Sequence, residues 1–240
     1  MTRLFIDEQI KGDQIEISGE NCHYIKNVLR LKEREQIICI KNKKEFLCNI
    51  DKIEKNSIIL LIEEECCAHT ENEFDITLFQ GIPKSDKLEF IIEKATEAGA
   101  TEIIPLKLQR CIAKIETKDL EKKLDRYNKI SKSAAQQSGR LIVPKVLTPV
   151  SVSEIDPAAF DLKLVAYEDE QKTSLKQILE QNPTAKRIAV IIGPEGGIAQ
   201  SEIEALIQKG FTPVSLGNRI LRCETAGLYA IANINYAKTK

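Results

Sequence analysis

The sequence contains no tryptophan, only one methionine and two histidines, and no long run of apolar residues. Its apolar stretches are far shorter than the roughly 18 residues that a membrane-spanning helix needs. The amino-terminal residues reach the acidic pair Asp7 and Glu8 too early for the apolar core of a secretory signal. We therefore expect a cytoplasmic protein with no membrane partner.

Cysteines are present, but their arrangement does not suggest cross-links. The seven cysteines are odd in number and scattered, and Cys66 and Cys67 form the only close pair. This pattern is not that of a disulfide framework. No Cys-x-x-Cys motif occurs, and His23 and His69 are far from any cysteines at the spacing of a zinc site. We expect free thiols and no metal.

The chain also lacks an excess of charge of either sign, since its formal net charge is −1 at pH 7. A protein that coats nucleic acid through charge alone is therefore excluded. The segment from Lys107 to Lys145 differs, because it holds eleven lysines and arginines against four acidic residues. The helix expected inside it, over 118–138, has either a solvated charged face or an RNA-binding face, and the sequence leaves both open.

The first part of the chain has the short, alternating pattern of a small β-barrel. Strands are expected over 3–6, 14–18, 36–40, 46–50 and 57–62, with one helix over 20–29. The charged and turn-prone stretch 63–73 then predicts a linker. We predict a first domain over residues 1–70.

From residue 74 the pattern changes to strands and helices in alternation, which predicts an α/β domain over 74–240 with a mainly parallel sheet. Strands are expected over 75–80, 102–106, 162–166, 188–192 and 213–216. Helices are expected over 86–98, 118–138, 174–180, 201–209 and 224–236. The last helix has almost no polar face, which is typical of a central core helix or of a helix in a homodimer interface.

A glycine-rich turn, Gly193-Pro194-Glu195-Gly196-Gly197, joins an apolar run to an amphipathic segment. Glycines accept positive φ and lack a Cβ, so backbone N–H groups can converge there on a bound group. No lysine follows as a Walker A loop requires, and the turn lies too late in the chain for a dinucleotide fingerprint. Ser201 and Glu204 have the spacing of a helix capping box. A purely structural turn remains an alternative reading of the glycines alone.

A second motif follows one strand later, where residues 216–226 read Leu-Gly-Asn-Arg-Ile-Leu-Arg-Cys-Glu-Thr-Ala. Together the two motifs resemble the signature of the RsmE family, the 16S rRNA uridine-N3 methyltransferases of the SPOUT superfamily. Other segments agree with that resemblance: Lys84, 94–99, 104–105, Arg110, 137–140, 143–144 and His23 with 28–30. Departures from the family pattern stand at Ile198-Ala199, Gln136 and Arg34.

The resemblance implies a PUA-like β-barrel, which binds RNA, followed by an α/β SPOUT domain with a deep trefoil knot. It further implies S-adenosylmethionine as cofactor, 16S rRNA of the small ribosomal subunit as substrate, and a homodimer. The expected reaction is methylation of N3 of one uridine. The alternatives are another RNA position or a ribose 2′-OH, or a non-catalytic rRNA-binding assembly factor.

The chemistry suggests two catalytic residues. Methylation at N3 requires loss of a proton, and a fixed cation stabilises the negative charge that develops on the base. Arg222 is the candidate for this cation, and an ion pair at a surface or interface is its alternative role. Glu224 is the candidate for accepting the proton or orienting Arg222, and a carboxylate favoured by a helix dipole is its alternative role.

The resemblance also implies binding residues in three loops and on the barrel. Cofactor contacts are expected from Ala166, Gly193, Pro194, Glu195, Gly196, Gly197, Leu216, Gly217, Ile220, Leu221, Thr225 and Ala226. RNA contacts are expected from Arg3, Arg30, Lys84, Arg110, Gln137 and Arg140.

Overall fold

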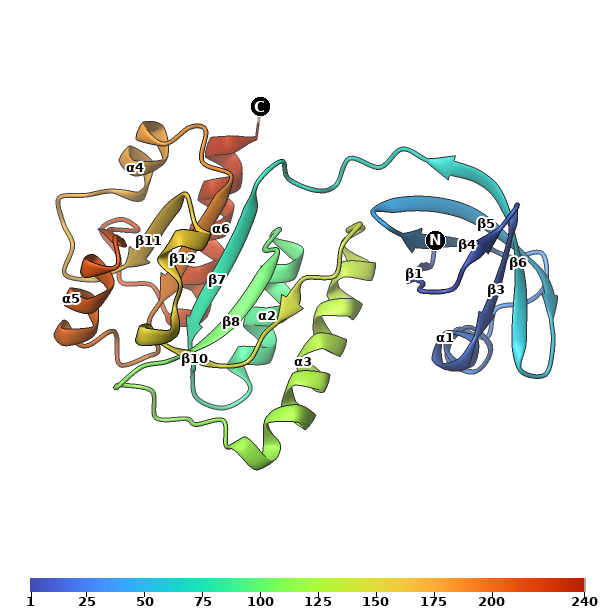
Figure 1. The fold of residues 1–240 in the computed structure, drawn as a ribbon, viewed down its shortest axis with the longest axis horizontal. Coiled ribbons are helices and arrows are strands. Elements are labelled where there is room, and N and C mark those ends of the chain that lie inside the picture. The colour runs from blue at the N-terminus through green and yellow to red at the C-terminus, as the bar shows by residue number, and fades with distance from the viewer. Residues whose placement is uncertain (240) are drawn as a thin grey trace. The chain divides into compact units, whose positions relative to one another are not determined.

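A computed structural model describes residues 1–239 of the chain, and Figure 1 shows the order of its elements. The chain divides into two compact units, Met1–Glu71 with Ala135–Ile142, and Asn72–Ala134 with the residues from Val143 onward. The boundary between the predicted domains, 1–70 and 74–240, lies close to the division between Glu71 and Asn72. The difference lies in 135–142, which the sequence analysis assigned to the second domain and which groups with the first unit.

The first unit is built on a six-stranded sheet in the order β1-β4-β5-β6-β3-β2. Its strands are β1 (Arg3–Phe5), β2 (Ile10–Lys11), β3 (Gln14–Ser18), β4 (Gln36–Lys41), β5 (Lys44–Ile53) and β6 (Ser57–Cys66). Alternate residues of β3 are buried, so Ile15 and Ile17 enter the core while their neighbours face outward. The five predicted strands are confirmed. The two-residue β2 was missed, and β6 extends into the predicted linker because it pairs with the long β5.

One helical segment packs against this sheet. It starts as α1 (Gly19–His23) and continues as a π-helical stretch, η1 (Tyr24–Leu29). Cys22 and Ile25 point into the core of the unit. Arg30 ends the segment in the left-handed conformation, with φ of 56°. The predicted helix over 20–29 is thus confirmed, although its second half is wound more widely than an α-helix.

The second unit contains an entirely parallel sheet in the order β10-β8-β7-β12-β11-β13, with β9 also paired to β8. Its strands are β7 (Asp75–Gly81), β8 (Glu102–Lys107), β9 (Lys145–Val146), β10 (Val150–Ser151), β11 (Leu162–Ala166), β12 (Arg187–Ile192) and β13 (Thr212–Val214). The predicted α/β fold is confirmed. The short edge strands β9 and β10 were missed, since two residues carry no periodic pattern.

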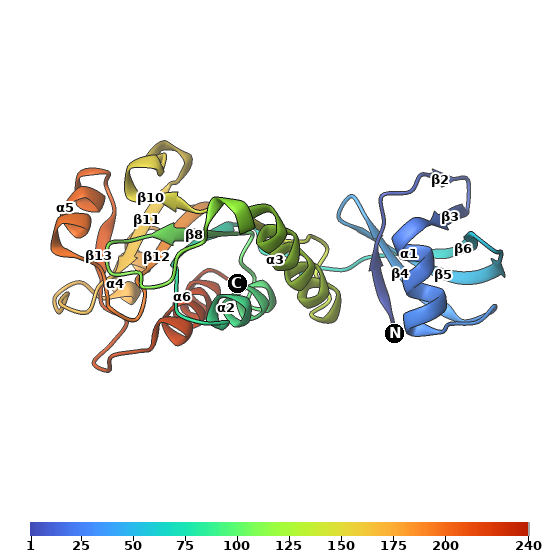
Figure 2. The ribbon, with the colours of Figure 1, turned by 90° about the horizontal axis from the view of Figure 1, so that it is seen from below.

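Helices cover both faces of this sheet. They are α2 (Lys87–Glu97), α3 (Thr117–Gln137), α4 (Leu175–Gln181), α5 (Gln200–Gln208) and α6 (Cys223–Lys238), with short 3-10 turns η2 (Val152–Glu154) and η3 (Pro157–Ala159). Consecutive residues of a strand point to opposite faces. Leu78 therefore joins the core under α2, α4 and α6, while Phe79 joins the core under α5. Figure 2 shows α2 and α6 lying side by side.

The last helix, α6, presents two different faces. Ala230, Ile231 and Ile234 are buried in the main core of the second unit. Tyr229 and Tyr236 are 40% and 89% exposed on the other side. Both readings of its apolar sequence therefore remain compatible with the fold, because one face fills the core and the other offers aromatic surface.

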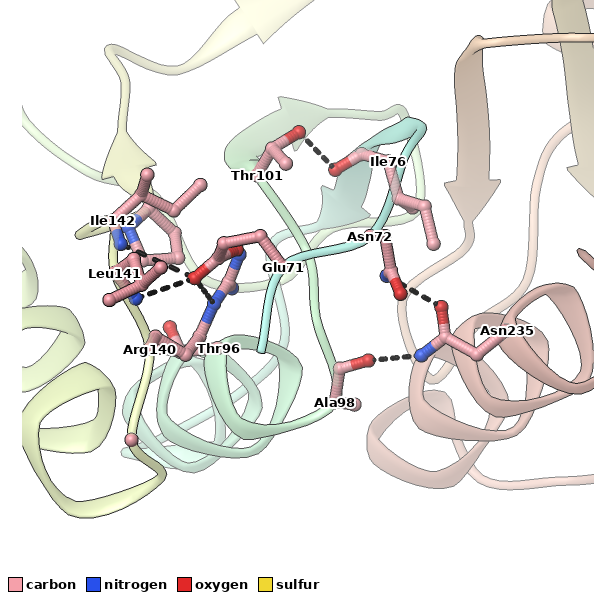
Figure 3. A network of polar contacts seen from close by, with 12 residues as sticks. Glu71, Asn72, Ile76, Thr96, Ala98, Thr101, Arg140, Leu141, Ile142 and Asn235 are labelled. Atoms are coloured by element: carbon pink, nitrogen blue, oxygen red, sulfur yellow. Dashed lines mark hydrogen bonds and ion pairs between the residues drawn. The ribbon is translucent and has the colours of Figure 1, made fainter. Parts of the chain in front are cut away.

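Polar side chains also fix α6 to its neighbours in the second unit (Figure 3). The Asn72 side-chain amide donates to the side-chain oxygen of Asn235 at 2.9 Å, and the Asn235 amide donates to the carbonyl of Ala98 at 2.5 Å. Gly99 follows α2 with φ of +100°, a conformation that favours glycine at a helix end. Among the helices of residues 1–239, none is long and apolar enough to span a bilayer.

Candidate functional site: a pocket at the ends of three parallel strands

A pocket of about 800 Å³ opens where the loops after β11, β12 and β13 meet. These three strands are parallel, and β11 lies between the other two, so their carboxyl ends share one edge of the sheet. Ligand sites of open α/β sheets form at this edge. The volume lies within the range of small-molecule and cofactor sites.

The structure brings most of the predicted cofactor residues together in this pocket. Ten of them line it: Ala166, Gly193, Pro194, Glu195, Gly197, Leu216, Gly217, Ile220, Leu221 and Ala226. Gly196 and Thr225 do not. Gly196 turns toward Arg110, whose guanidinium donates to its carbonyl at 3.0 Å, and Thr225 is exposed in the first turn of α6.

The glycine-rich loop is held so closely that side chains would not fit. A Cβ at Gly193 would lie 2.9 Å from the Ile198 side chain, and a Cβ at Gly197 would overlap the Glu168 carboxylate. Gly197 also has φ of +71°, which L-residues rarely adopt. Its N–H donates to the carbonyl of Pro194 at 2.9 Å and closes a tight turn. The expectation that this loop needs glycine thus has a steric reason at Gly193 and a conformational reason, the positive φ, at Gly197.

The predicted capping box at Ser201 and Glu204 is wrong. Helix α5 begins at Gln200 with Ala199 as its N-cap residue, and the Glu202 carboxylate accepts from the Ala199 N–H at 3.2 Å. Glu202 is buried and also accepts from the Gln109 N–H at 2.9 Å. Glu202, in the first turn of α5, is therefore held by a contact with a residue 93 positions away in the chain.

Two carboxylates and one ammonium form an ion-pair network beside the pocket. The Lys87 Nζ lies 3.0 Å from Glu195 Oε1 and 3.3 Å from Glu224 Oε2. Glu195 also accepts from the Lys84 N–H at 3.2 Å, and Glu224 accepts from the Cys223 thiol at 3.2 Å. The glycine-rich loop, the start of α2 and the start of α6 are linked through these contacts.

The network changes the pKa values of its members. The pKa of Glu224 is lowered, chiefly by its own backbone N–H and further by the Cys223 thiol and Lys87, against the opposing effect of burial. Burial alone would raise the pKa of Glu195, but its own backbone N–H, Lys87 and the Lys84 N–H together lower it. Burial and the bond to Glu224 raise the pKa of Cys223 to about 12. At neutral pH both carboxylates are charged and the thiol is neutral.

Arg222 is the N-cap residue of α6. Its carbonyl accepts from the N–H groups of Thr225 and Ala226 at 2.9 and 2.8 Å, which fixes its backbone. Its side chain is exposed and lines the pocket. The guanidinium makes no hydrogen bond or ion pair with any residue in the described range 1–239. A fixed backbone thus carries an unpaired cation at the rim of the pocket.

Four of the predicted RNA residues are exposed. Arg30 ends η1, and Gln137 is the last residue of α3. Lys84 and Arg110 flank the glycine-rich loop, through the Lys84 N–H to Glu195 and the Arg110 guanidinium to Gly196. The backbone of Lys84 and the side chain of Arg110 therefore contact the loop that lines the pocket.

Arg3 and Arg140 have a different environment, inside the first unit. The Arg140 side chain is only 5% exposed, and its NH2 group lies 2.6 Å from Glu71 Oε2 (Figure 3). The other Glu71 oxygen accepts from the N–H groups of Leu141 and Ile142 at 2.7 and 3.3 Å. Arg3 pairs with Glu45 and donates to the Gly139 carbonyl at 3.2 Å. Both guanidinium groups are engaged within the protein, and we therefore do not propose that they contact RNA.

Several residues of the pocket were not among the named cofactor candidates, although Asn218, Arg219 and Cys223 lie within the predicted loop 216–226. The residues not named are Lys87, Tyr167, Glu168, Glu170, Gln171, Ile192, Ser215, Asn218, Arg219 and Cys223. A general rule was available for some of them, since residues directly after parallel strands gather at one edge. Nothing in the sequence indicated that Lys87, at the start of α2, reaches the loops after β12 and β13. Within residues 1–239, no cluster of three or more His, Cys, Asp or Glu side chains is placed to hold a metal ion.

Comparisons with known proteins assign a class to each unit. A family model described as an RNA methyltransferase domain matches residues 70–235. Another, described as an RNA methyltransferase PUA domain, matches residues 17–63. The α/β unit with its pocket is therefore of the RNA methyltransferase class, and the small β-rich unit is confirmed as PUA-like.

Full-length relatives narrow the class. The ribosomal RNA small subunit methyltransferase E of Bacillus subtilis is 36% identical, over 98% of this chain and 96% of its own length. The protein of that name from Mesomycoplasma hyopneumoniae is 33% identical, over 96% of this chain and 97% of its own. The crystal structure of the Neisseria gonorrhoeae protein of that name, bound to S-adenosyl methionine, matches with a TM-score of 0.86 at 31% identity and covers 99% of this chain and 98% of that chain. The chain belongs to the ribosomal RNA small subunit methyltransferase E family, which confirms the resemblance drawn from the two motifs.

Replacement of Arg140 by methionine leaves the Glu71 carboxylate without its guanidinium partner. Because the remaining charge is mostly shielded from water but keeps two backbone donors, we expect the free energy of unfolding to fall by roughly 2 kcal/mol. Chemical denaturation followed by circular dichroism measures this change. The matched control is Arg187→Met, which breaks an ion pair whose side chains are 54% and 36% exposed and costs less than about 1 kcal/mol. Equal losses for the two variants would contradict a structural role of Arg140.

Proposed function

We propose that this protein transfers the methyl group of S-adenosylmethionine to N3 of a specific uridine in 16S rRNA of the small ribosomal subunit. The observation that carries the proposal is the pocket at the ends of β11, β12 and β13, with the unpaired Arg222 at its rim. The relative from Neisseria gonorrhoeae, which has the same fold, was solved with S-adenosyl methionine bound. The curated relatives are named for methylation of small-subunit rRNA.

The residues of the pocket fit this cofactor. Leu216, Ile220, Leu221 and Ala226 contribute apolar side chains to the pocket lining, and we propose that they contact the adenine. Gly193, Pro194, Glu195 and Gly197 bring the glycine-rich loop to the pocket lining, so that its backbone is available to the cofactor. The bound cofactor supplies an electrophilic methyl group on a sulfonium. We propose that the predicted cofactor residues, including Gly196 and Thr225 at the border of the pocket, hold it.

Arg222 is proposed to stabilise the charge that develops on the base. The N3 atom of uridine carries a proton, and when that proton leaves, negative charge spreads onto the two carbonyl oxygens of the ring. A preorganised cation without a competing partner stabilises this charge strongly in a site that excludes water. The Arg222 guanidinium has no competing partner within residues 1–239, its backbone is fixed by two hydrogen bonds, and we propose that bound cofactor and RNA exclude water around it.

Glu224 is better suited to positioning than to accepting the proton. A general base is most effective when its pKa lies near the working pH. The pKa of Glu224 is lowered, and its Oε2 already accepts from Lys87 and Cys223. We therefore propose that Glu224 orients the start of α6, and that water or substrate groups remove the N3 proton.

Exposed side chains on both units are proposed to contact the RNA. Lys84 and Arg110 lie beside the glycine-rich loop and would reach phosphates around the target uridine. Arg30 and Gln137 would extend the contact over the PUA-like unit. Cations position a nucleic acid backbone without reading its sequence. This role agrees with a chain whose net charge is close to zero and whose substrate is recognised by shape.

We further propose a deep trefoil knot, a homodimer and a cytoplasmic location. The proposal of the knot rests on the resemblance of the two carboxy-terminal motifs to the SPOUT superfamily. Support for the homodimer is the exposed aromatic face of α6, with Tyr229 and Tyr236. The location follows from the substrate, which is ribosomal RNA.

Mass spectrometry of nucleosides tests the reaction directly. We expect small-subunit rRNA from cells that lack this protein to lose one N3-methyluridine, and the purified protein to restore it with S-adenosylmethionine. Analysis of digested 16S rRNA before and after incubation measures both. Restoration of a 2′-O-methyl group or another methylated base instead would overturn the N3 assignment. Full retention of N3-methyluridine in the deficient cells would overturn the function.

Replacement of Arg222 by alanine separates chemistry from cofactor binding. We expect the single-turnover rate of methyl transfer to fall by about 100-fold or more, because one preorganised donor is lost. Affinity for S-adenosylmethionine, measured by calorimetry, should stay within about 3-fold, since backbone and apolar contacts hold the cofactor. Arg187→Met is a control with the same loss of charge on an exposed surface. A near-normal rate for Arg222→Ala would show that another group supplies the cation.

Salt titration tests the proposed RNA contacts. Each phosphate contact releases counterions, so its removal reduces the slope of log affinity against log salt by about one unit. We expect this reduction for Arg110→Met. Arg187→Met, which removes an equal charge elsewhere, should leave the slope unchanged. Equal slopes for wild type and Arg110→Met would remove Arg110 from the interface.

A further inference from the structure

The pocket contains an unusual distribution of charge. Glu195 and Glu224 are both ionised, and Arg222 stands two residues before Glu224 in the chain. Guanidinium and carboxylate groups within reach of one another ordinarily pair, because charge-assisted hydrogen bonds are among the strongest in proteins. Arg222, Glu195 and Lys87 line the same pocket. Within residues 1–239, however, no ion pair of Arg222 is found. One feature of the structure occupies these carboxylates in place of Arg222.

Lys87 is that feature. Its ammonium bridges the two carboxylates, at 3.0 Å from Glu195 and 3.3 Å from Glu224. Both carboxylates are otherwise supplied with donors, Glu195 by the Lys84 N–H and Glu224 by the Cys223 thiol. Their hydrogen-bonding capacity is thus largely used before Arg222 could compete for it.

The position of Lys87 is set by the packing of α2. Lys87 is the first residue of this helix, directly after its N-cap residue Asp86. The next turn is anchored in the core by Leu88, Ile91 and Ile92, which are at most 3% exposed. The Lys87 side chain is itself only 33% exposed. The start of a well-anchored helix therefore holds the ammonium against the glycine-rich loop and the start of α6.

We propose that Lys87 is a positioning residue that occupies Glu195 and Glu224 and thereby keeps the Arg222 guanidinium available to the reacting base. The proposal rests on the function proposed above. Without Lys87, the two carboxylates lose their cation and become open to Arg222, and an ion pair there removes the cation from the base. The uncompensated carboxylates also repel the negative charge that develops during the reaction.

A purely structural clamp is the competing role for the same contacts. Lys87 links the glycine-rich loop to α6, so its loss could simply loosen the pocket. The two roles make opposite predictions when the carboxylates are also neutralised. A loosened pocket stays loose without any ion pair, whereas an Arg222 captured by carboxylates is released once those carboxylates are gone.

The test compares Lys87→Met with a triple variant, Lys87→Met, Glu195→Gln and Glu224→Gln. We expect Lys87→Met to slow single-turnover methyl transfer by about 30-fold or more with little change in cofactor affinity. The triple variant should recover most of that loss, and Lys87→Arg should recover part of it. A triple variant that is folded but no faster than Lys87→Met would overturn the proposal.

The matched control is Lys94→Met. Lys94 lies on the same helix, pairs with Glu93 and Glu97 at 2.8 and 2.7 Å, and has a side chain 34% exposed. It does not line the pocket. We expect its loss to leave the rate of methyl transfer unchanged. A decrease equal to that of Lys87→Met would indicate a general effect of weakening α2 and would count against the specific role.

A second measurement does not depend on catalysis. Phenylglyoxal reacts with unpaired guanidinium groups, and peptide mapping by mass spectrometry gives the rate at Arg222 alone. We expect this rate to fall several-fold in Lys87→Met and to return in the triple variant. An unchanged rate in Lys87→Met would overturn the proposal even in an active protein. If the wild type transfers no methyl group while these changes are seen, the proposed function fails and the charge arrangement stands.

Discussion

The site depends on one constraint, that β12, β11 and β13 are neighbouring parallel strands whose carboxyl ends share one edge of the sheet. Hydrogen bonding between parallel strands fixes their direction and register, so the loops that follow them must emerge together. Residues from three distant parts of the chain meet there around one pocket. The burial of both sheet faces keeps this edge rigid, because apolar residues of β7, β11 and β12 fill two separate cores.

Charge at this edge is organised by the helices that start beside it. The amino terminus of α2 delivers Lys87, and that of α6 delivers Arg222 and Glu224. Lys87 pairs with Glu195 and Glu224, while Arg222 has no ion pair within residues 1–239. Packing of α2 and α6 in one core therefore sets where these charged side chains begin.

Much of the fold was predictable, because periodic apolar patterns identify long elements. The five main strands of the parallel sheet and its five helices were predicted from residues 74–236, and the two carboxy-terminal motifs identified the family. Short or unusual elements were not predictable. The strands β2, β9 and β10 have two residues each, and the start of α5 is determined by Glu202, which bonds to Gln109 from a distant loop.

The sequence by itself determined the class of fold, the family and most residues that line the pocket, since these depend on local patterns and short motifs. Only the tertiary structure decided which charges are free. Arg140 and Arg222 are both arginines in family-like motifs, yet Arg140 is buried against Glu71 while Arg222 lines the pocket unpaired. Lys87 gained its position from a helix packed on another part of the chain. Pairing of charges depends on distances between residues far apart in sequence, and only the folded chain sets those distances.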